Sequence, residues 1–165
     1  MPTLDQLKHS LISAIRGARE ELRELDPLAG FALATDDEVT TLYHVACSKA
    51  WVEENHKQYK EIGDIFVEWQ ESADDELFRV ISKALREKKE NTPTGNFAKA
   101  RNARFNMLVK ALADCRQAGL FDADTLLCVG STDPGEHMED LDKKAAYRLN
   151  AKPVADRYAK SRCWK

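Results

Sequence analysis

The stretch that decides the fold runs from Leu126 to Asn150 and reads LLCVGSTDPGEHMEDLDKKAAYRLN. Its first four residues form a short apolar run, closed by a glycine and a serine, which predicts a buried strand. The next residues predict the start of a helix. Its N-cap is Asp133, its first helical residue is Pro134, and Glu136 completes a capping box with Asp133. Apolar residues recur three and four positions apart beyond them, so a helix that packs one face inward is predicted.

The N-terminal half predicts a helix followed by a hairpin. Leucines and other apolar residues recur at helical spacing over Thr3–Leu25, and Thr3 and Gln6 form a capping-box pair. Two runs rich in residues that favour strands, Phe31–Thr35 and Val39–Cys47, flank a short acidic turn, which indicates an antiparallel pair. Ile65–Trp69 alternates in the same way and predicts a third strand.

Residues that commonly begin or end helices and loops delimit the remaining segments. Ser48 is a candidate cap for a short helix, and a further helix is expected between about Asp74 and Leu85. The polar segment 86–96 contains a proline and a glycine and predicts a mobile loop. A long helix over Phe97–Cys115 should end at Gly119, and the basic tail 152–165 predicts a last short helix.

This order of elements predicts a single α+β domain over residues 1–165. The expected architecture is a mostly antiparallel sheet of about four strands packed with helices, which cover one side of it. Five large apolar residues are expected to share one core: Trp69, Leu126, Val129, Leu141 and Leu149.

Composition excludes several classes of protein. The 165 residues carry a net charge of −3, which disfavours binding of nucleic acid by a basic field. No apolar run is long enough to predict a membrane span, and the first residues do not resemble a secretory signal. The four cysteines are scattered without a paired motif, which favours a reduced cytoplasmic protein.

No pattern predicts a catalytic residue, a cofactor or a metal. His44 and Cys47 lie three apart in an expected strand and therefore point to opposite faces, which makes them a poor pair of metal ligands. Cys128 lies inside an apolar run, where a thiol behaves as a small hydrophobe. Arg101 and Arg104 share a helix face that is interpreted as solvated.

Acidic clusters are the remaining candidates for function. Each of them could be a turn, a helix start or a solvated face, because acidic residues are common at all three. That structural interpretation is favoured for any single cluster, although the carboxylates could also bind a metal or act as acid and base. A further interpretation is that a cluster faces a basic partner, as surfaces steered by complementary charge do. The candidate partner-binding residues are Asp36, Asp37, Glu38, Asp74, Asp75, Glu76, Glu136, Glu139, Asp140 and Asp142.

Several patches together resemble an uncharacterised bacterial family, the domain of unknown function 4303. They are FALATDDEVTTLY, FVEWQES, ALADCRQAGLFD, LLCVGSTDPGE and YRLN, and they run from the first helix through Asn150. The resemblance implies an α+β domain without an established activity, similar to the immunity proteins encoded beside secreted polymorphic toxins. The basic tail from Lys152 onward falls outside it.

Two classes of function therefore compete. The first is a cytoplasmic immunity protein that binds and neutralises a cognate toxin, such as one delivered by type VI secretion, by occluding its site. The second is an enzyme or small-ligand-binding protein with a pocket near the end of the 126–129 strand, where Asp133 and Arg148 would supply polar groups.

Overall fold

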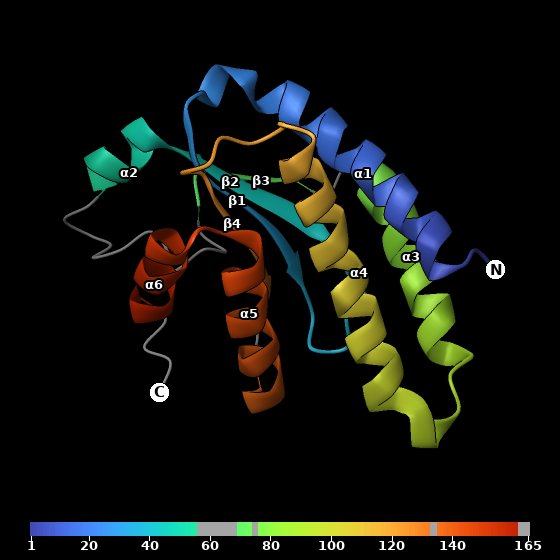
Figure 1. The fold of residues 1–165 in the computed structure, drawn as a ribbon. Helices are drawn as coiled ribbons and strands as arrows, with labels where there is room; N and C mark the ends of the chain where they lie inside the picture. The colour runs from blue at the N-terminus through green and yellow to red at the C-terminus, as the bar shows by residue number, and fades with distance from the viewer. Residues whose placement is uncertain (56–68, 74–75, 133–134, 162–165) are drawn as a thin grey trace.

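The computed structural model describes residues 1–55, 69–73, 76–132 and 135–161. Figure 1 shows a sheet with helices packed around it, and the chain is an α+β protein. The strands are β1 (Leu28–Thr35), β2 (Tyr43–Ser48), β3 (Glu71–Ala73) and β4 (Leu126–Ser131). The α-helices are α1 (Leu4–Glu21), α2 (Lys49–Asn55), α3 (Glu76–Glu90), α4 (Phe97–Gln117), α5 (Glu136–Leu149) and α6 (Lys152–Ser161). Among the described residues, the 3₁₀ turn η1 (Leu22–Leu25) follows α1, and the 3₁₀ turn η3 (Thr94–Asn96) precedes α4.

The sheet is mixed, with the strand order β3-β2-β1-β4. β2 pairs antiparallel with both β1 and β3, whereas β4 runs parallel to β1. The predicted pairing of the first two strands is confirmed, but β1 begins earlier and β2 later than expected. The predicted strand Ile65–Trp69 lies largely outside the described residues, and the strand that pairs with β2 begins at Glu71.

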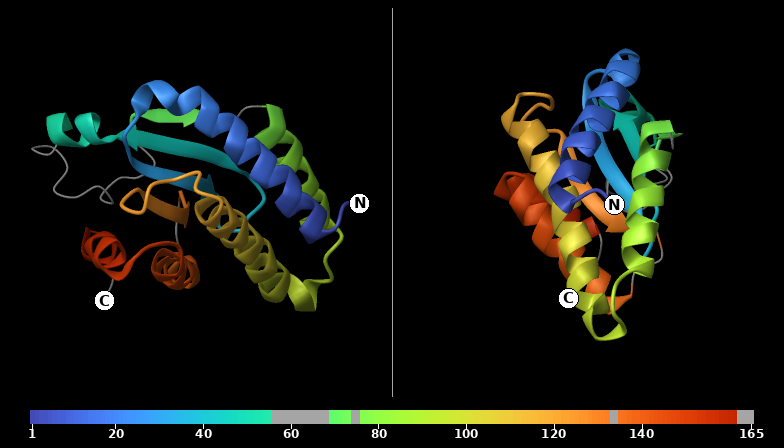
Figure 2. Two further views of the ribbon diagram at one scale, coloured as in Figure 1. Left: turned by 45° about the horizontal axis from the view of Figure 1, so that its top comes forward. Right: turned by 90° about the vertical axis from the view of Figure 1, so that its right-hand side faces the viewer.

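Both faces of the sheet are covered, so the prediction of helices on one side only was wrong. Phe31, Leu33, Leu127 and Val129 pack in one core with α1, α3 and α4. The alternate residues of β1 and β4 belong to a second core, together with Val154 and Tyr158 of α6. α5 lies along β4 and contributes residues to both cores (Figures 1 and 2). A strand buried on both faces reads as a continuous apolar run, which is what Leu126–Val129 shows.

The expected single core is therefore divided by the sheet. Val129 and Leu149 belong to the first core and Leu141 packs against it, whereas Trp69 and Leu126 lie in the second. Trp69 itself is buried, with only 4% of its surface exposed.

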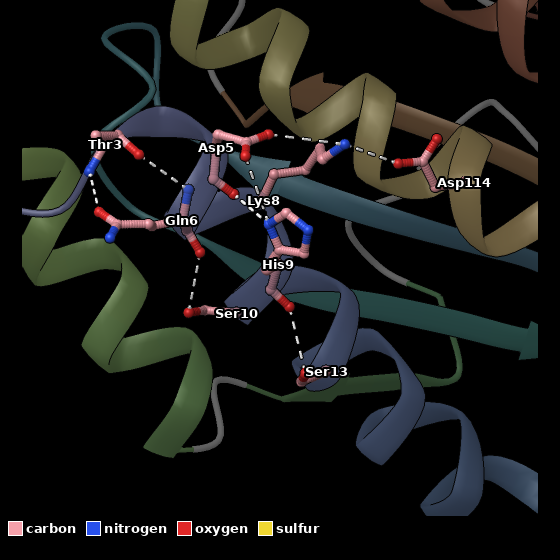
Figure 3. Close-up of polar contacts among 8 residues, drawn as sticks. All are labelled: Thr3, Asp5, Gln6, Lys8, His9, Ser10, Ser13 and Asp114. Atoms are coloured by element: carbon pink, nitrogen blue, oxygen red, sulfur yellow. Dashed lines mark hydrogen bonds and ion pairs between the residues drawn. The ribbon is translucent and has the colours of Figure 1, made fainter.

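The start of α1 follows the sequence prediction (Figure 3). The backbone N–H of Gln6 donates to Thr3 Oγ1 at 3.2 Å, and that of Thr3 donates to Gln6 Oε1 at 2.8 Å, which completes the capping box. One turn further on, Lys8 Nζ donates to Asp114 Oδ2 at 3.1 Å and joins α1 to α4.

The side chain of Asn150 connects α5 to the outer edge of β4. Its Oδ1 accepts the backbone N–H of Leu127 at 2.8 Å, and its Nδ2 donates to the Leu127 carbonyl at 2.7 Å. The same Nδ2 donates to the carbonyl of Ala146 at 2.9 Å, and Arg116 Nη2 donates to Oδ1 at 3.2 Å. The amide thus satisfies backbone groups of an edge strand that would otherwise lack a neighbour.

A tyrosine of α6 closes the second core against α5. The hydroxyl of Tyr158 donates to both carboxylate oxygens of Asp142, at 3.1 and 3.3 Å, and both side chains are buried. The predicted terminal helix is confirmed as α6, while residues 162–165 lie outside the described part of the chain.

Replacing Gly30 should be costly because the indole of Trp69 occupies the space beside it. A Cβ built on Gly30 would lie 2.5 Å from Trp69 Cη2, whereas one built on Gly17 in α1 meets nothing within 4 Å. We expect Gly30→Ala to destabilise the fold by about 1–3 kcal/mol through overpacking. The matched Gly17→Ala should stabilise it by up to ~1 kcal/mol through helix propensity. Urea unfolding of both variants checks this, and equal stabilities would contradict the packing of Trp69 on β1.

Substitutions at Asn150 should separate size from hydrogen bonding. Asn150→Ala leaves the N–H and carbonyl of Leu127 without their partner, at a cost of about 1–3 kcal/mol for each group that stays buried. Asn150→Asp keeps the size and the acceptor but cannot donate to the Leu127 and Ala146 carbonyls at neutral pH. Both variants should therefore unfold at lower urea than the wild type. An Asp variant as stable as the wild type would show that the amide donors contribute nothing.

Candidate functional site

The first acidic cluster, Asp36–Asp37–Glu38, is used to build the loop between β1 and β2. Asp36 accepts both the backbone N–H and the hydroxyl of Thr40, at 2.7 and 2.5 Å. Asp37 accepts the hydroxyl of Ser131 at 2.5 Å and the backbone N–H of Gly135 at 3.3 Å. Asp36 therefore closes the loop on itself, whereas Asp37 ties the end of β1 to the end of β4 and to the start of α5.

Glu38 links the same loop to the helices. Its backbone carbonyl accepts Arg104 Nη2 at 2.8 Å, and its carboxylate lies 3.8 Å from Lys89 Nζ. The next residue, Val39, is buried with φ +54°, a conformation that β-branched residues rarely adopt. The bonds made by its acidic neighbours hold it there, and no pattern of residues around Val39 indicated this strain.

The second cluster is only partly described. Asp74 and Asp75 lie outside the described residues, whereas Glu76 opens α3 and is exposed. Beside it, Leu77 and Val80 are 51% and 60% exposed. The outer face of α3 therefore combines one described carboxylate with two apolar side chains.

The third cluster lies on α5 and divides between surface and interior. Glu136, Glu139 and Asp140 are exposed, but Asp142 has only 2% of its surface exposed. Asp142 is therefore not available to a partner, because its carboxylate is enclosed with the hydroxyl of Tyr158. An acidic residue one position after Leu141 looked like part of a charged surface, and only the position of α6 shows otherwise.

The predicted cap of α5 was wrong. The helix begins at Glu136 with Gly135 as its N-cap, and no side chain caps it. Asp133 and Pro134 lie outside the described residues and precede the helix, and Glu136 is its first residue instead of its third. Arg148 lies in the last turn, as expected, where its charge complements the helix dipole.

An exposed tyrosine accompanies the acidic residues of α5. Tyr147 is 43% exposed, and its hydroxyl donates to Asp156 Oδ1 at 2.9 Å. Glu136, Asp140 and Tyr147 are spaced at four and seven residues and share one helix face, which Glu139 borders. We call Glu136, Glu139, Asp140 and Tyr147 the α5 surface.

A pocket lies where the start of α1 meets the α3–α4 connection. Its volume is about 420 Å³. The polar residues that line it are Lys88, Asn91, Thr92, Asn96, Lys99 and Arg104. We call this cavity the α3–α4 pocket. The segment 86–96 that forms part of its rim is not one loop, since α3 continues to Glu90.

Arg104 was wrongly interpreted as part of a solvated face. Only 2% of its surface is exposed, and burial lowers the pKa of its guanidinium, although Glu38 and Asp36 act in the opposite direction. It lies one turn before Leu108, in the row that continues to Cys115 on the buried side of α4. That spacing was the signal by which the sequence could have shown a buried arginine.

The described cysteines are unsuited to nucleophilic chemistry. Cys47, Cys115 and Cys128 are buried. Burial raises the pKa of Cys47 to about 12 and that of Cys115 to about 11, so both stay protonated at neutral pH. Within residues 1–55, 69–73, 76–132 and 135–161, no group of three His, Cys, Asp or Glu side chains could hold a metal ion.

The comparisons with known proteins give a family. Residues 11–151 match the family described as Domain of unknown function (DUF4303). The chain belongs to this family. The match covers every strand and all the helices from α2 to α5, and it ends before α6. The chain has no significant match among the curated proteins or the solved structures.

The name DUF4303 describes no activity, so a function for this member has to be argued from its own residues. None of the helices in the described ranges is long and apolar enough to cross a membrane.

Carboxylates that look alike in the sequence should differ in their effect on stability. Asp36→Ala leaves the backbone N–H and the hydroxyl of Thr40 without their acceptor and should cost about 1–3 kcal/mol. Asp140→Ala, on the exposed face of α5, should change the stability by less than about 0.5 kcal/mol. Thermal unfolding of the two variants checks this. Equal losses would contradict a structural role for the first cluster.

Proposed function

We propose that this DUF4303 protein is an immunity protein that binds a cognate protein toxin in the cytoplasm and neutralises it by occluding its site. The observation that carries the proposal is the α5 surface, where three exposed carboxylates in the first half of the helix and a 43% exposed tyrosine in its last turn lie along one side of the helix. Tyrosine is enriched in the centre of protein interfaces because it buries a large rigid area with little loss of entropy.

Helix stability accounts for only part of this surface. Glu136 and Glu139 lie in the first turn, where acidic side chains favour the helix dipole. The helix dipole explains neither the carboxylate of Asp140 nor the exposure of Tyr147. A partner with a basic surface and a socket for an aromatic ring would use all four side chains.

Occlusion requires the partner's active site to be basic at its rim. An acidic α5 surface would steer such a toxin by long-range attraction, and the tyrosine would hold it after contact. The acidic patch is confined to the first half of α5, because Lys143 and Lys144 follow it. The predicted contact therefore extends along α5, from the carboxylates near its N-terminal end to Tyr147 in its last turn, about two turns beyond Asp140.

Reversing the charge of the α5 surface should slow association with the toxin. The test begins with co-purification of the product of the neighbouring gene, then measures binding kinetics and rescue of growth. Glu136→Lys, Glu139→Lys and Asp140→Lys together should lower the association rate by about 10-fold or more at low salt, because electrostatic steering spans 10–10³-fold. Raising the salt should shrink the difference, since screening weakens attraction between exposed charges.

Matched variants locate the contact. Glu20→Lys, Glu21→Lys and Glu24→Lys change the net charge equally at the other end of the chain and should leave the rate near that of the wild type. Tyr147→Ala should raise the dissociation rate about 10-fold or more, as loss of an aromatic hot spot does. Tyr147→Phe keeps the ring and loses only the bond to Asp156, so it should bind almost normally.

The outer face of α3 is the competing contact surface. Its two exposed apolar side chains beside Glu76 favour an interface by the same reasoning. If Val80→Lys abolishes rescue while the α5 variants do not, the immunity role stands and the α5 surface is the wrong contact. Failure of the neighbouring product to bind the protein at all would overturn the role itself.

A further inference from the structure

We propose that the α3–α4 pocket binds a small molecule that carries a phosphate group and a short apolar part. The proposal concerns the isolated chain and does not depend on the toxin. Three kinds of observation support it: the charge of the lining, a buried arginine without full compensation, and an apolar wall opposite the charges.

The lining is cationic without a matching anion. Lys88, Lys99 and Arg104 contribute three positive charges, and no carboxylate is among the lining residues. Asn91 and Asn96 add amide groups that can donate hydrogen bonds, although one donor of Asn91 is used by the Glu87 carbonyl. The hydroxyl of Thr92 already donates to the carbonyl of Lys88 at 2.7 Å and can only accept. With three cations at one cavity, a dianion is matched better than a singly charged group, which favours phosphate over carboxylate.

Arg104 supplies the strongest argument. Only 2% of its surface is exposed, and its Nη2 donates to the neutral backbone carbonyl of Glu38. Its Nε has no hydrogen-bond partner among the described residues. The negative charges of Asp36 and Glu38 partly offset the burial of this cation, but neither carboxylate forms an ion pair with it among the described residues. A buried charge is costly unless it is paired, and an anion in the pocket would provide the missing compensation.

The start of α4 reinforces the positive potential. Asn96, its N-cap, makes no side-chain capping bond and lines the pocket, so the positive end of the helix dipole lies at this part of the lining. The remaining wall is apolar and consists of Met1, Leu4, Ala100 and Ala103. A volume of about 420 Å³ exceeds what a bare phosphate needs, so the ligand should carry an apolar part beside its anionic group.

Three probes test the class of ligand by isothermal titration of the purified full-length protein. Phenyl phosphate should bind saturably with one site per chain. Inorganic phosphate lacks the apolar part and benzoate carries a single charge, so both should bind at least about 10-fold more weakly, a difference of 1.4 kcal/mol. Affinity for phenyl phosphate should rise between about pH 5 and pH 7, since the second ionisation of a phosphate group lies near 6.

A charge-matched pair of variants tests the site. Lys88→Glu with Lys99→Glu removes two lining cations and should weaken binding of phenyl phosphate at least about 10-fold, because charge-assisted hydrogen bonds to a phosphate are lost and two repelling carboxylates are introduced. Lys83→Glu with Lys110→Glu makes the same charge change on the same two helices outside the pocket and should bind like the wild type. Thermal unfolding confirms that both double variants are folded.

Three results would overturn the proposal. One is the absence of saturable binding of phenyl phosphate up to about 10 mM, which lies beyond the weakest affinities of specific sites. Another is equal weakening by both double variants, which would mean a general charge effect. The third is benzoate binding as tightly as phenyl phosphate, which would exclude a site built for a dianion.

Discussion

The fold depends on satisfying the outer edge of β4, and one amide does this. β4 is the edge strand that runs parallel to β1, so its outer N–H and carbonyl groups have no strand beside them. Asn150 replaces that strand at Leu127 with one donor and one acceptor. Arg116 reaches the same amide from α4 and also donates to the carbonyl of Thr125 at 2.6 Å, just before β4 begins. α4, α5 and β4 are thereby fixed to one another through a single polar point.

Local signals in the sequence predicted local structure. The capping box at Thr3, the serine cap before α2 and the glycine after α4 were all confirmed, because each involves residues within a few positions of one another. The parallel pairing of β4 with β1 could not be predicted, since nothing in either run specifies its neighbour. The second core was missed for a related reason. It is assembled from the alternate faces of β1 and β4, a tryptophan near β3 and a helix at the end of the chain.

The acidic clusters show how acidic residues take three different roles in one fold. In the loop after β1 the carboxylates accept backbone and hydroxyl hydrogens and hold a strained valine, and on α5 three of them meet solvent. Asp142 is a third case, enclosed beneath α6. All these positions carry acidic residues in the sequence. Their roles differ because the fold places different residues around each of them. The candidate binding surface was therefore predictable as a set of acids, but not the subset that is free to bind, nor the tyrosine beside it.

The boundary of the DUF4303 match has a consequence for fragments of this chain. The match ends at residue 151, one position before α6, yet Val154 and Tyr158 of α6 complete the second core. The matched region by itself leaves the alternate face of β1 and β4 short of part of its cover. In this chain α6 supplies that cover through Val154 and Tyr158. A fragment of this chain cut at residue 151 would therefore expose part of the second core and be an incomplete fold.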